Sequence, residues 1–207
     1  MGLLTRFYFH GNRNSRKVAL TFDDSPSEET LKILKVLKKY NAKATFFVCG
    51  KRIKGREKII KKIISEGHEV GNHTWDHSSL LLKSKKFCIE QISKTDELLK
   101  KFGVRSDLFR PPYFRLGLGA FFACRALDKR IVGGDMIPGD WILKKDDLKI
   151  IDKILRKARS GSIIILHDYL ENIGEHKRIS SLTQEVCKGL IKKNFKLVTV
   201  SELIRTS

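Results

Sequence analysis

The sequence predicts a single α/β domain over residues 1–207, folded as a distorted (β/α) barrel of about seven parallel strands. Three observations favour this fold. Short β-rich runs alternate with amphipathic helices, one of the runs is apolar on both faces, and no linker or internal repeat divides the chain. An open, doubly wound sheet is the alternative that the same pattern leaves.

Seven segments have the composition of strands, being short and rich in β-branched or aromatic residues. They are Lys17–Phe22, Ala44–Val48, Glu69–Asn72, Asp107–Arg110, Arg130–Gly133, Ser162–His167 and Lys196–Val200. Within the sixth, Ile163–Leu166 is apolar at every position, as a strand covered on both faces requires.

Five segments between the strands carry apolar residues at helical spacing. Ser25-Pro26-Ser27-Glu28 has the form of a capping box with proline at the first helical position, and predicts a helix to about Lys39. Its inward residues are Leu31, Leu34 and Leu37. The other predicted helices are Arg56–Glu66, Ser84–Phe102, Asp147–Arg159 and Leu182–Lys193.

The composition is that of a globular protein, with 41% hydrophobic and 31% charged residues. No apolar run is long enough to cross a bilayer, and Met1–Asn14 lacks the features of a secretory signal. We therefore expect a cytoplasmic protein, unless a leader has been removed. The four cysteines, Cys49, Cys88, Cys124 and Cys187, form no C-x-x-C pair and are expected to be free, mostly buried thiols in a reducing compartment.

The net charge is +19, from 42 lysines and arginines against 23 acidic residues, and such a charge favours anionic surfaces. The lysines are spread over predicted helices, as at Lys32, Lys35 and Lys38, which indicates solvated outer faces. We find no glycine–aromatic motif and no helix-turn-helix pattern, so no dedicated nucleic-acid partner is expected.

Titratable residues follow the ends of the predicted strands. They are Asp23 and Asp24, His73 and His77, Arg110, Asp140, and His167. Because the carboxyl ends of parallel strands gather at one edge of a barrel, where ligands bind, these side chains are expected to share one active site.

His73 and His77 are four residues apart, so both rings would project from one face if that turn is helical. This spacing alone is weak, since paired histidines on a helix are often surface residues. Asp24 would complete the His, His, carboxylate donor set of catalytic zinc hydrolases. Asp23 would then remain as a general base. The alternative is that an aspartate caps the next helix, a role that Ser25 already fills well.

Arg110 opens the run Arg110-Pro111-Pro112-Tyr113. Two prolines remove two backbone donors, so the amide of Tyr113 is the first donor after Arg110 and could stabilise an oxyanion. The guanidinium could hold a carboxylate by paired hydrogen bonds. The alternative interpretation, a rigid surface loop with a structural arginine, fits this motif equally well.

Two further residues suit a sugar hydrolase. Trp141, which follows Asp140, could form an apolar wall against a sugar ring, although core packing is the usual fate of a lone tryptophan. His167 ends an apolar strand, where it could protonate a leaving group or serve as a structural histidine.

Together, these motifs resemble those of the polysaccharide deacetylase family, also called NodB-homology domains or carbohydrate esterase family four. The similarity covers about Val18–Leu203. The matching stretches, in order, are Thr21–Asp24, Gly67–His77, Arg110–Tyr113, Asp140–Trp141 and Leu166–Asp168, with Lys43–Val48 similar to the family's second strand. The first two motifs are highly specific together.

The resemblance implies a distorted (β/α) barrel that binds one divalent metal, with zinc the first choice, and removes N-acetyl groups from amino sugars or their polymers. It implies Asp23 as general base, oriented by Arg110, and His167 as general acid. The metal ligands would be Asp24, His73 and His77. Trp141 and Leu166 would line the pocket for the acetyl methyl, and Asp140 would support either Arg110 or His167.

Three positions depart from the family pattern. Ser25 and Phe114 stand where glycine is usual, and Ile137 stands where an aspartate is usual, with Asp135 nearby at a different spacing. Other functions remain open on the same residues: hydrolysis of another linear or cyclic amide or of an N-formyl sugar, or sugar binding without catalysis. The complete acid, base and ligand set argues against a non-catalytic protein, because binding alone needs no acid–base pair.

Overall fold

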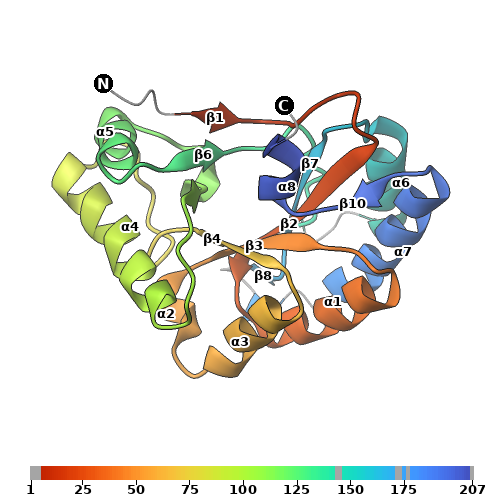
Figure 1. Ribbon diagram of the computed structural model, residues 1–207, viewed down its shortest axis with the longest axis horizontal. Coiled ribbons are helices and arrows are strands. Elements are labelled where there is room, and N and C mark those ends of the chain that lie inside the picture. The colour runs from red at the N-terminus through yellow and green to blue at the C-terminus, as the bar shows by residue number, and fades with distance from the viewer. Residues whose placement is uncertain (1–5, 143–145, 171–173, 176–177, 206–207) are drawn as a thin grey trace.

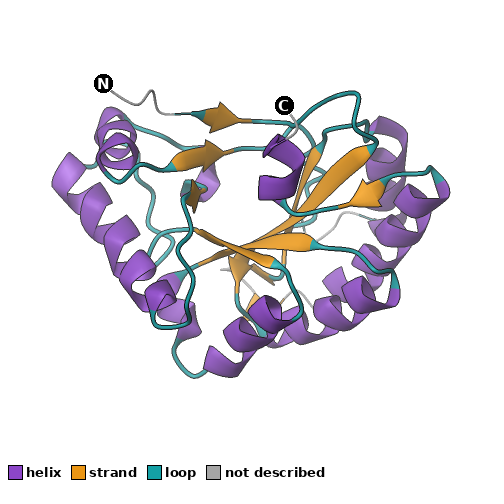
Figure 2. Cartoon of the chain, viewed as in Figure 1, coloured by secondary structure: helices purple, strands orange, loops and turns teal. Residues whose placement is uncertain are grey.

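Parallel strands form the centre of the molecule and curl into a distorted barrel, with helices on the outside (Figures 1 and 2). The computed structural model describes residues 6–142, 146–170, 174–175 and 178–205. The first five residues of the Met1–Asn14 segment lie outside the described residues.

All seven predicted strands are present, and their pairings are all parallel. The strand order is β1 (Phe7–Tyr8), β6 (Arg130–Val132), β5 (Leu108–Phe109), β4 (Glu69–Asn72), β3 (Ala44–Val48) and β2 (Lys17–Ser25). The other edge of β2 pairs with both β7 (Ile163–His167) and β10 (Lys196–Leu197). The sequence did not indicate β1, a short strand that pairs with β6.

Irregular contacts close the barrel between β7 and the segments that follow β1 and β6. Isolated bridges join His10 to Ser162 and Met136 to Ile164 in place of a continuous ladder. The barrel prediction is confirmed, and this seam is where the barrel is distorted.

The five predicted helices are present; four have slightly shorter bounds, and the fifth, predicted over Leu182–Lys193, starts three residues earlier. They are α1 (Glu28–Lys39), α3 (Glu57–Ser65), α4 (Lys85–Lys100), α6 (Asp147–Lys157) and α7 (Ile179–Lys192). Elements that were not predicted are α2 (Gly50–Ile53), the 3-10 turn η1 (Pro112–Phe114), α5 (Leu118–Ala126), α8 (Val200–Arg205) and the hairpin of β8 (Tyr169–Leu170) with β9 (Gly174–Glu175). None of the described helices is long and apolar enough to span a membrane.

Two predicted boundaries are wrong. The strand predicted over Lys196–Val200 ends at Leu197, because Val200 begins α8. The helix predicted to start at Ser25 and Pro26 starts at Glu28, with Ser27 as N-cap, and the backbone N–H of Ser27 donates to Thr30 Oγ1 at 2.9 Å. Ser25 instead ends β2.

Alternation along β2 separates the helix-facing core from the barrel interior. Val18, Leu20 and Phe22 belong to the buried cluster that includes residues of α1, α3, α6 and α7. Ala19 belongs to a second cluster, with residues such as Phe47 and Val132. Because successive side chains of a strand point to opposite faces, Asp23 shares the face of Ala19 and lies at the mouth of the barrel.

Candidate active site

The two aspartates lie where β2 ends, between the ends of β3 and β7. Asp23 is the registered partner of His167 on β7, so parallel pairing alone brings the expected base and acid side by side. Asp24 follows with a left-handed backbone, φ 68°. Both carboxylates are almost completely buried. Neither aspartate is the N-cap of α1, so the capping alternative is wrong.

Asp24, His73 and His77 form the candidate metal centre. The Nε2 atoms of His73 and His77 lie 3.9 and 3.2 Å from Asp24 Oδ1. One donor atom from each residue lies within 4.8 Å of the other two, and all three residues are buried. Donors around a tetrahedral ion with bonds of about 2.0–2.2 Å are separated by roughly 3.3 Å, so this set fits a divalent metal.

The two histidines come together on a loop rather than on a helical turn. Residues 73–77 have no helical structure, and Thr74 and His77 have left-handed φ values of 70° and 65°. Local hydrogen bonds hold the loop: Asn72 Oδ1 accepts from the Thr74 N–H at 2.8 Å, and Thr74 Oγ1 accepts from the His77 N–H at 3.1 Å. The structure brings the three expected ligand residues together, and their role as metal ligands stays a prediction; the helical geometry considered for them was wrong.

The hydrogen bond of His73 leaves one ring nitrogen available for a metal. Its Nδ1 lies 2.7 Å from the carbonyl oxygen of Arg110. A carbonyl can only accept, so Nδ1 carries the proton and Nε2 faces Asp24 with its lone pair. Burial also lowers the pKa of His73 to about 4, which keeps the ring neutral, as a metal ligand must be.

Arg110 fills the barrel behind Asp23 and is fully buried. Its Nη1 donates to Asp23 Oδ1 at 2.6 Å, and its Nε and Nη2 donate to the carbonyls of Val132 and Gly133. Burial tends to raise the pKa of Asp23, but the charge of Arg110 outweighs it and holds that pKa below its ordinary value. The arginine is therefore a partner of Asp23, through one nitrogen rather than by the paired contact that was considered.

Asp140 supports His167, which settles the choice that the sequence left open. Asp140 Oδ2 accepts the backbone N–H of His167 at 2.7 Å, and Oδ1 lies 3.1 Å from Nδ1 of its ring. Burial opposes protonation of His167, but the charge of Asp140 raises the pKa to about 9. At neutral pH, His167 therefore carries the proton that a general acid needs.

Aromatic rings flank the site on two sides. The ring of Tyr113 lies over His77 with centroids 4.7 Å apart, and the ring of Trp141 meets His167 edge-on at 5.2 Å. Both side chains are exposed, Tyr113 by 50% and Trp141 by 41%, so Trp141 is not a core residue. Oxyanion binding by the Tyr113 amide remains a prediction.

Leu166 lies on the other face of β7 from His167. It belongs to the helix-facing cluster together with Ile164 and is fully buried. Strand alternation places Ile165, not Leu166, on the face of His167. The predicted role of Leu166 as an acetyl-pocket residue therefore has no support from its position.

The departures from the family pattern have structural consequences. Tyr113 and Phe114 have φ values of 56° and 54°, in the left-handed region that glycine adopts without strain. Asp135 lies at the start of β7, where it accepts from the Ile163 N–H at 2.9 Å and pairs with Arg13 at 2.8 Å. It is therefore at the opposite end of the strand from His167 and cannot replace the missing aspartate.

Asp168 is a buried carboxylate whose role the sequence did not indicate. Its Oδ2 accepts the hydroxyl of Ser25 at 2.8 Å and that of Thr30, and its backbone oxygen accepts from Ser27 at 3.0 Å. Burial raises its pKa to about 7. Asp168 thus ties the end of β7 to the end of β2 and to the start of α1. Its place directly after His167 was the only sequence signal for it.

Comparison with known proteins gives the same family as the motifs. Residues 10–120 match the family described as polysaccharide deacetylase. The chain is 37% identical, over 92% of its length, to the peptidoglycan-N-acetylmuramic acid deacetylase PdaC of Bacillus subtilis (strain 168), and it spans 39% of the length of that relative.

Solved structures share the whole fold. A peptidoglycan N-acetylglucosamine deacetylase in complex with 4-naphthalen-1-yl-N-oxidanyl-benzamide superposes with a TM-score of 0.90 and 32% identity, covering 98% of this chain and 94% of the other. A family-four pseudoenzyme from Bacillus anthracis superposes with a TM-score of 0.85, covering 97% of this chain and 69% of the other. At 23% identity, that second likeness shows the fold alone.

Proposed function

Because this chain belongs to the polysaccharide deacetylase family, we propose that it is a metal-dependent hydrolase that removes N-acetyl groups from amino sugars or their oligomers and polymers. The substrate type would be a chitooligosaccharide or peptidoglycan. PdaC is named for peptidoglycan N-acetylmuramic acid, and this chain spans 39% of its length, so the activity is proposed for the present chain from its own site.

The observation that carries the proposal is the pairing of an acid and a base beside a metal-ligand set. Asp23 and His167 are registered partners on β2 and β7, and Asp24 follows Asp23 directly. Arg110 favours the ionised form of Asp23, and Asp140 favours the protonated form of His167. These are the protonation states that hydrolysis of an amide requires of a base and an acid.

The proposed reaction is addition of water to the acetamide, followed by cleavage of the C–N bond. Bound at Asp24, His73 and His77, a divalent ion, which we propose to be zinc, would supply Lewis-acid polarisation. Asp23 accepts a proton from the attacking water, whose oxygen forms the new bond to the carbonyl carbon. His167 protonates the departing nitrogen as the C–N bond breaks, which leaves a free amine and acetate.

The flanking groups would orient the substrate. The exposed ring of Trp141 and the ring of Tyr113 would bound the sugar on two sides, and the Tyr113 amide would donate to the oxyanion. Arg110, held by the carbonyls of Val132 and Gly133, keeps Asp23 fixed and ionised. A sugar-binding protein without catalysis would need neither the Arg110–Asp23 pair nor the Asp140–His167 pair.

Acetate release tests the proposal. The protein, stripped of metal with a chelator and then supplied with zinc, is incubated with N-acetylglucosamine, chitooligosaccharides and peptidoglycan. We expect acetate from at least one of the polymers only when zinc is restored. Binding of these sugars with no acetate from any of them would refute the proposal and favour the non-catalytic alternative.

A further inference from the structure

The outer face of α5 carries two large exposed apolar side chains one turn apart. Leu118 is 79% exposed and Phe122 is 48% exposed. Residues four apart share one face of a helix, so the two side chains form one surface. On α1, by comparison, the exposed positions include the lysines Lys32 and Lys35. The apolar face of α5 therefore needs an explanation other than core packing.

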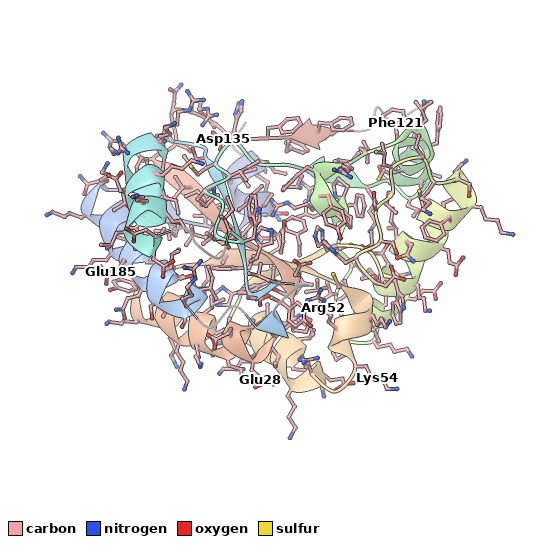
Figure 3. The ribbon with its side chains drawn as sticks, turned by 180° about the vertical axis from the view of Figure 1, so that it is seen from behind. Glu28, Arg52, Lys54, Phe121, Asp135 and Glu185 are labelled. Atoms are coloured by element: carbon pink, nitrogen blue, oxygen red, sulfur yellow. The ribbon has the colours of Figure 1, made fainter. Side chains whose placement is uncertain are left out.

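Neighbouring segments extend this surface on both sides. A Cβ on Gly119 would lie 2.1 Å from the Lys83 carbonyl oxygen, so the loop that carries Leu82 packs tightly against the start of α5. Leu82 is 94% exposed. On the other side, the ring of Phe121 stacks on that of Phe7 of β1, with centroids 6.3 Å apart. Figure 3 labels Phe121 on α5, next to β1. We call Leu82, Leu118, Phe121, Phe122 and Phe7 the apolar patch.

Exposed basic side chains share the segments that carry the apolar patch. The two segments that contribute most of it, residues 80–89 and 113–127, contain no acidic residue. They carry the exposed residues Lys83, Lys85, Lys86, Arg115 and Arg125, which we call the basic rim. Apolar side chains inside a cationic border are the composition of surfaces that lie on membranes.

We propose that the apolar patch and the basic rim dock the protein on an anionic lipid surface. Leucine and phenylalanine side chains enter the boundary between headgroups and acyl chains, and lysines and arginines near them are attracted to anionic headgroups. A second copy of the chain fits this surface less well, because a symmetric contact would bring two basic rims together. A glycan fits less well too, since the most exposed leucines offer no hydrogen bonds.

Segments of the patch and the rim are close in the chain to residues of the active site. Four residues, Pro111–Phe114, lie between Arg110 and Arg115 of the basic rim, and the loop that holds Leu82 follows His77. Docking through the patch would therefore hold the site beside the lipid surface. The inference does not depend on the proposed reaction, because lipid binding is measured without a sugar substrate.

Sedimentation with lipid vesicles tests the docking proposal. The full chain is mixed with vesicles of phosphatidylcholine alone, or of phosphatidylcholine with phosphatidylglycerol, and we expect binding only to the second. The double variant Leu82→Ser, Leu118→Ser should bind about 100-fold more weakly, since each exposed leucine loses its apolar contact. The matched control is Leu148→Ser, on α6 at the other flank of the molecule, where Leu148 is 73% exposed (Figure 1). It should bind like the unaltered protein.

The basic rim has its own variant. Replacing Lys83, Lys85 and Lys86 by glutamine should weaken binding to the anionic vesicles roughly fivefold per lysine, and added salt should mimic this loss. The Leu82→Ser, Leu118→Ser variant should still release acetate from a soluble chitooligosaccharide at the unaltered rate.

Several outcomes would overturn the docking proposal. These are no binding of the unaltered protein to anionic vesicles, equal binding by the double variant, or equal loss in the Leu148→Ser control. Sedimentation of the unaltered protein as a dimer that Leu118→Ser dissociates would assign the patch to a second copy. Loss of peptidoglycan binding in the double variant, with vesicle binding intact, would assign it to the glycan.

Discussion

Replacing Asp140 by asparagine tests how the site keeps His167 protonated. The two oxygens of Asp140 contact the backbone N–H and Nδ1 of His167 at 2.7 and 3.1 Å. Burial alone would lower the pKa of His167, yet the charge of Asp140 raises it from 6.5 to about 9. That rise corresponds to about 3 kcal/mol in favour of the imidazolium. Asparagine has the same shape without the charge, so the pKa should fall back towards its ordinary value of 6.5, with the charges of Asp23 and Asp24 still opposing the effect of burial.

The loss of activity should depend on pH in a defined direction. His167 is the acid below its pKa, so the unaltered enzyme should lose rate as pH rises through about 9. In Asp140→Asn, the protonated fraction of His167 at pH 8 falls from about nine tenths to about 3%, which predicts a loss of about 30-fold. At pH 6 most of the variant remains protonated, so its rate should be within about twofold of the unaltered rate.

The assay is kcat/KM for acetate release between pH 5.5 and 9.5, with the imidazole of His167 titrated by NMR in both proteins. A loss of equal size at pH 6 and pH 8 would refute the reasoning, because Asp140 would then act through geometry and not through charge. An unshifted NMR titration would refute it directly.

Other residues give predictions of the same kind. Asp23→Asn should keep its metal and lose about 10²–10⁴-fold in rate, whereas Asp24→Asn should lose metal affinity as well as rate. Zinc titration and turnover are measured on both variants. Loss of the metal by Asp23→Asn alone would show that the two roles are reversed. Burial lowers the pKa of His68 to about 4. The unfolded chain therefore binds this proton more tightly, and the fold should lose stability as the pH falls from about 6.5 towards 4. Between pH 7 and 5 the free energy of unfolding should drop by about 2 kcal/mol more than in His68→Asn, and equal drops in denaturant titrations would contradict this. Asp168→Ala should weaken zinc binding about 10–100-fold by releasing the end of β2, whereas Asp135→Ala, at the other end of β7, should not; calorimetry with zinc separates the two.

Much of the barrel could be predicted because its signals are local. Alternating β-rich and helical patterns located seven strands and five helices, and only their bounds moved. The elements that were missed, such as β1 (Phe7–Tyr8) and α2 (Gly50–Ile53), are too short for a periodic pattern. The wrong helix start predicted at Ser25 shows that local patterns also miss long-range hydrogen bonds. Its hydroxyl has a distant partner in Asp168, 143 residues away, which no local capping rule can anticipate.

The sequence by itself determined which residues meet at the site. Parallel strands place their carboxyl ends at one edge, so residues that follow strand ends, such as Asp23, Asp24 and His167, had to converge once the strands were identified. Their identities, two acids and a set of histidines, favoured metal-assisted hydrolysis over sugar binding without catalysis, which stayed open.

Only the tertiary structure decided the surroundings, the protonation and the orientation of each of these groups. The Arg110 carbonyl determines which nitrogen of His73 is protonated, the charge of Asp140 keeps His167 protonated, and the pleat of β7 turns Leu166 away from the site. Each of these depends on distances of about 3 Å between segments far apart in the chain. Hydrogen bonds and charge interactions at that range vary steeply with position, and only the packed barrel fixes position so closely.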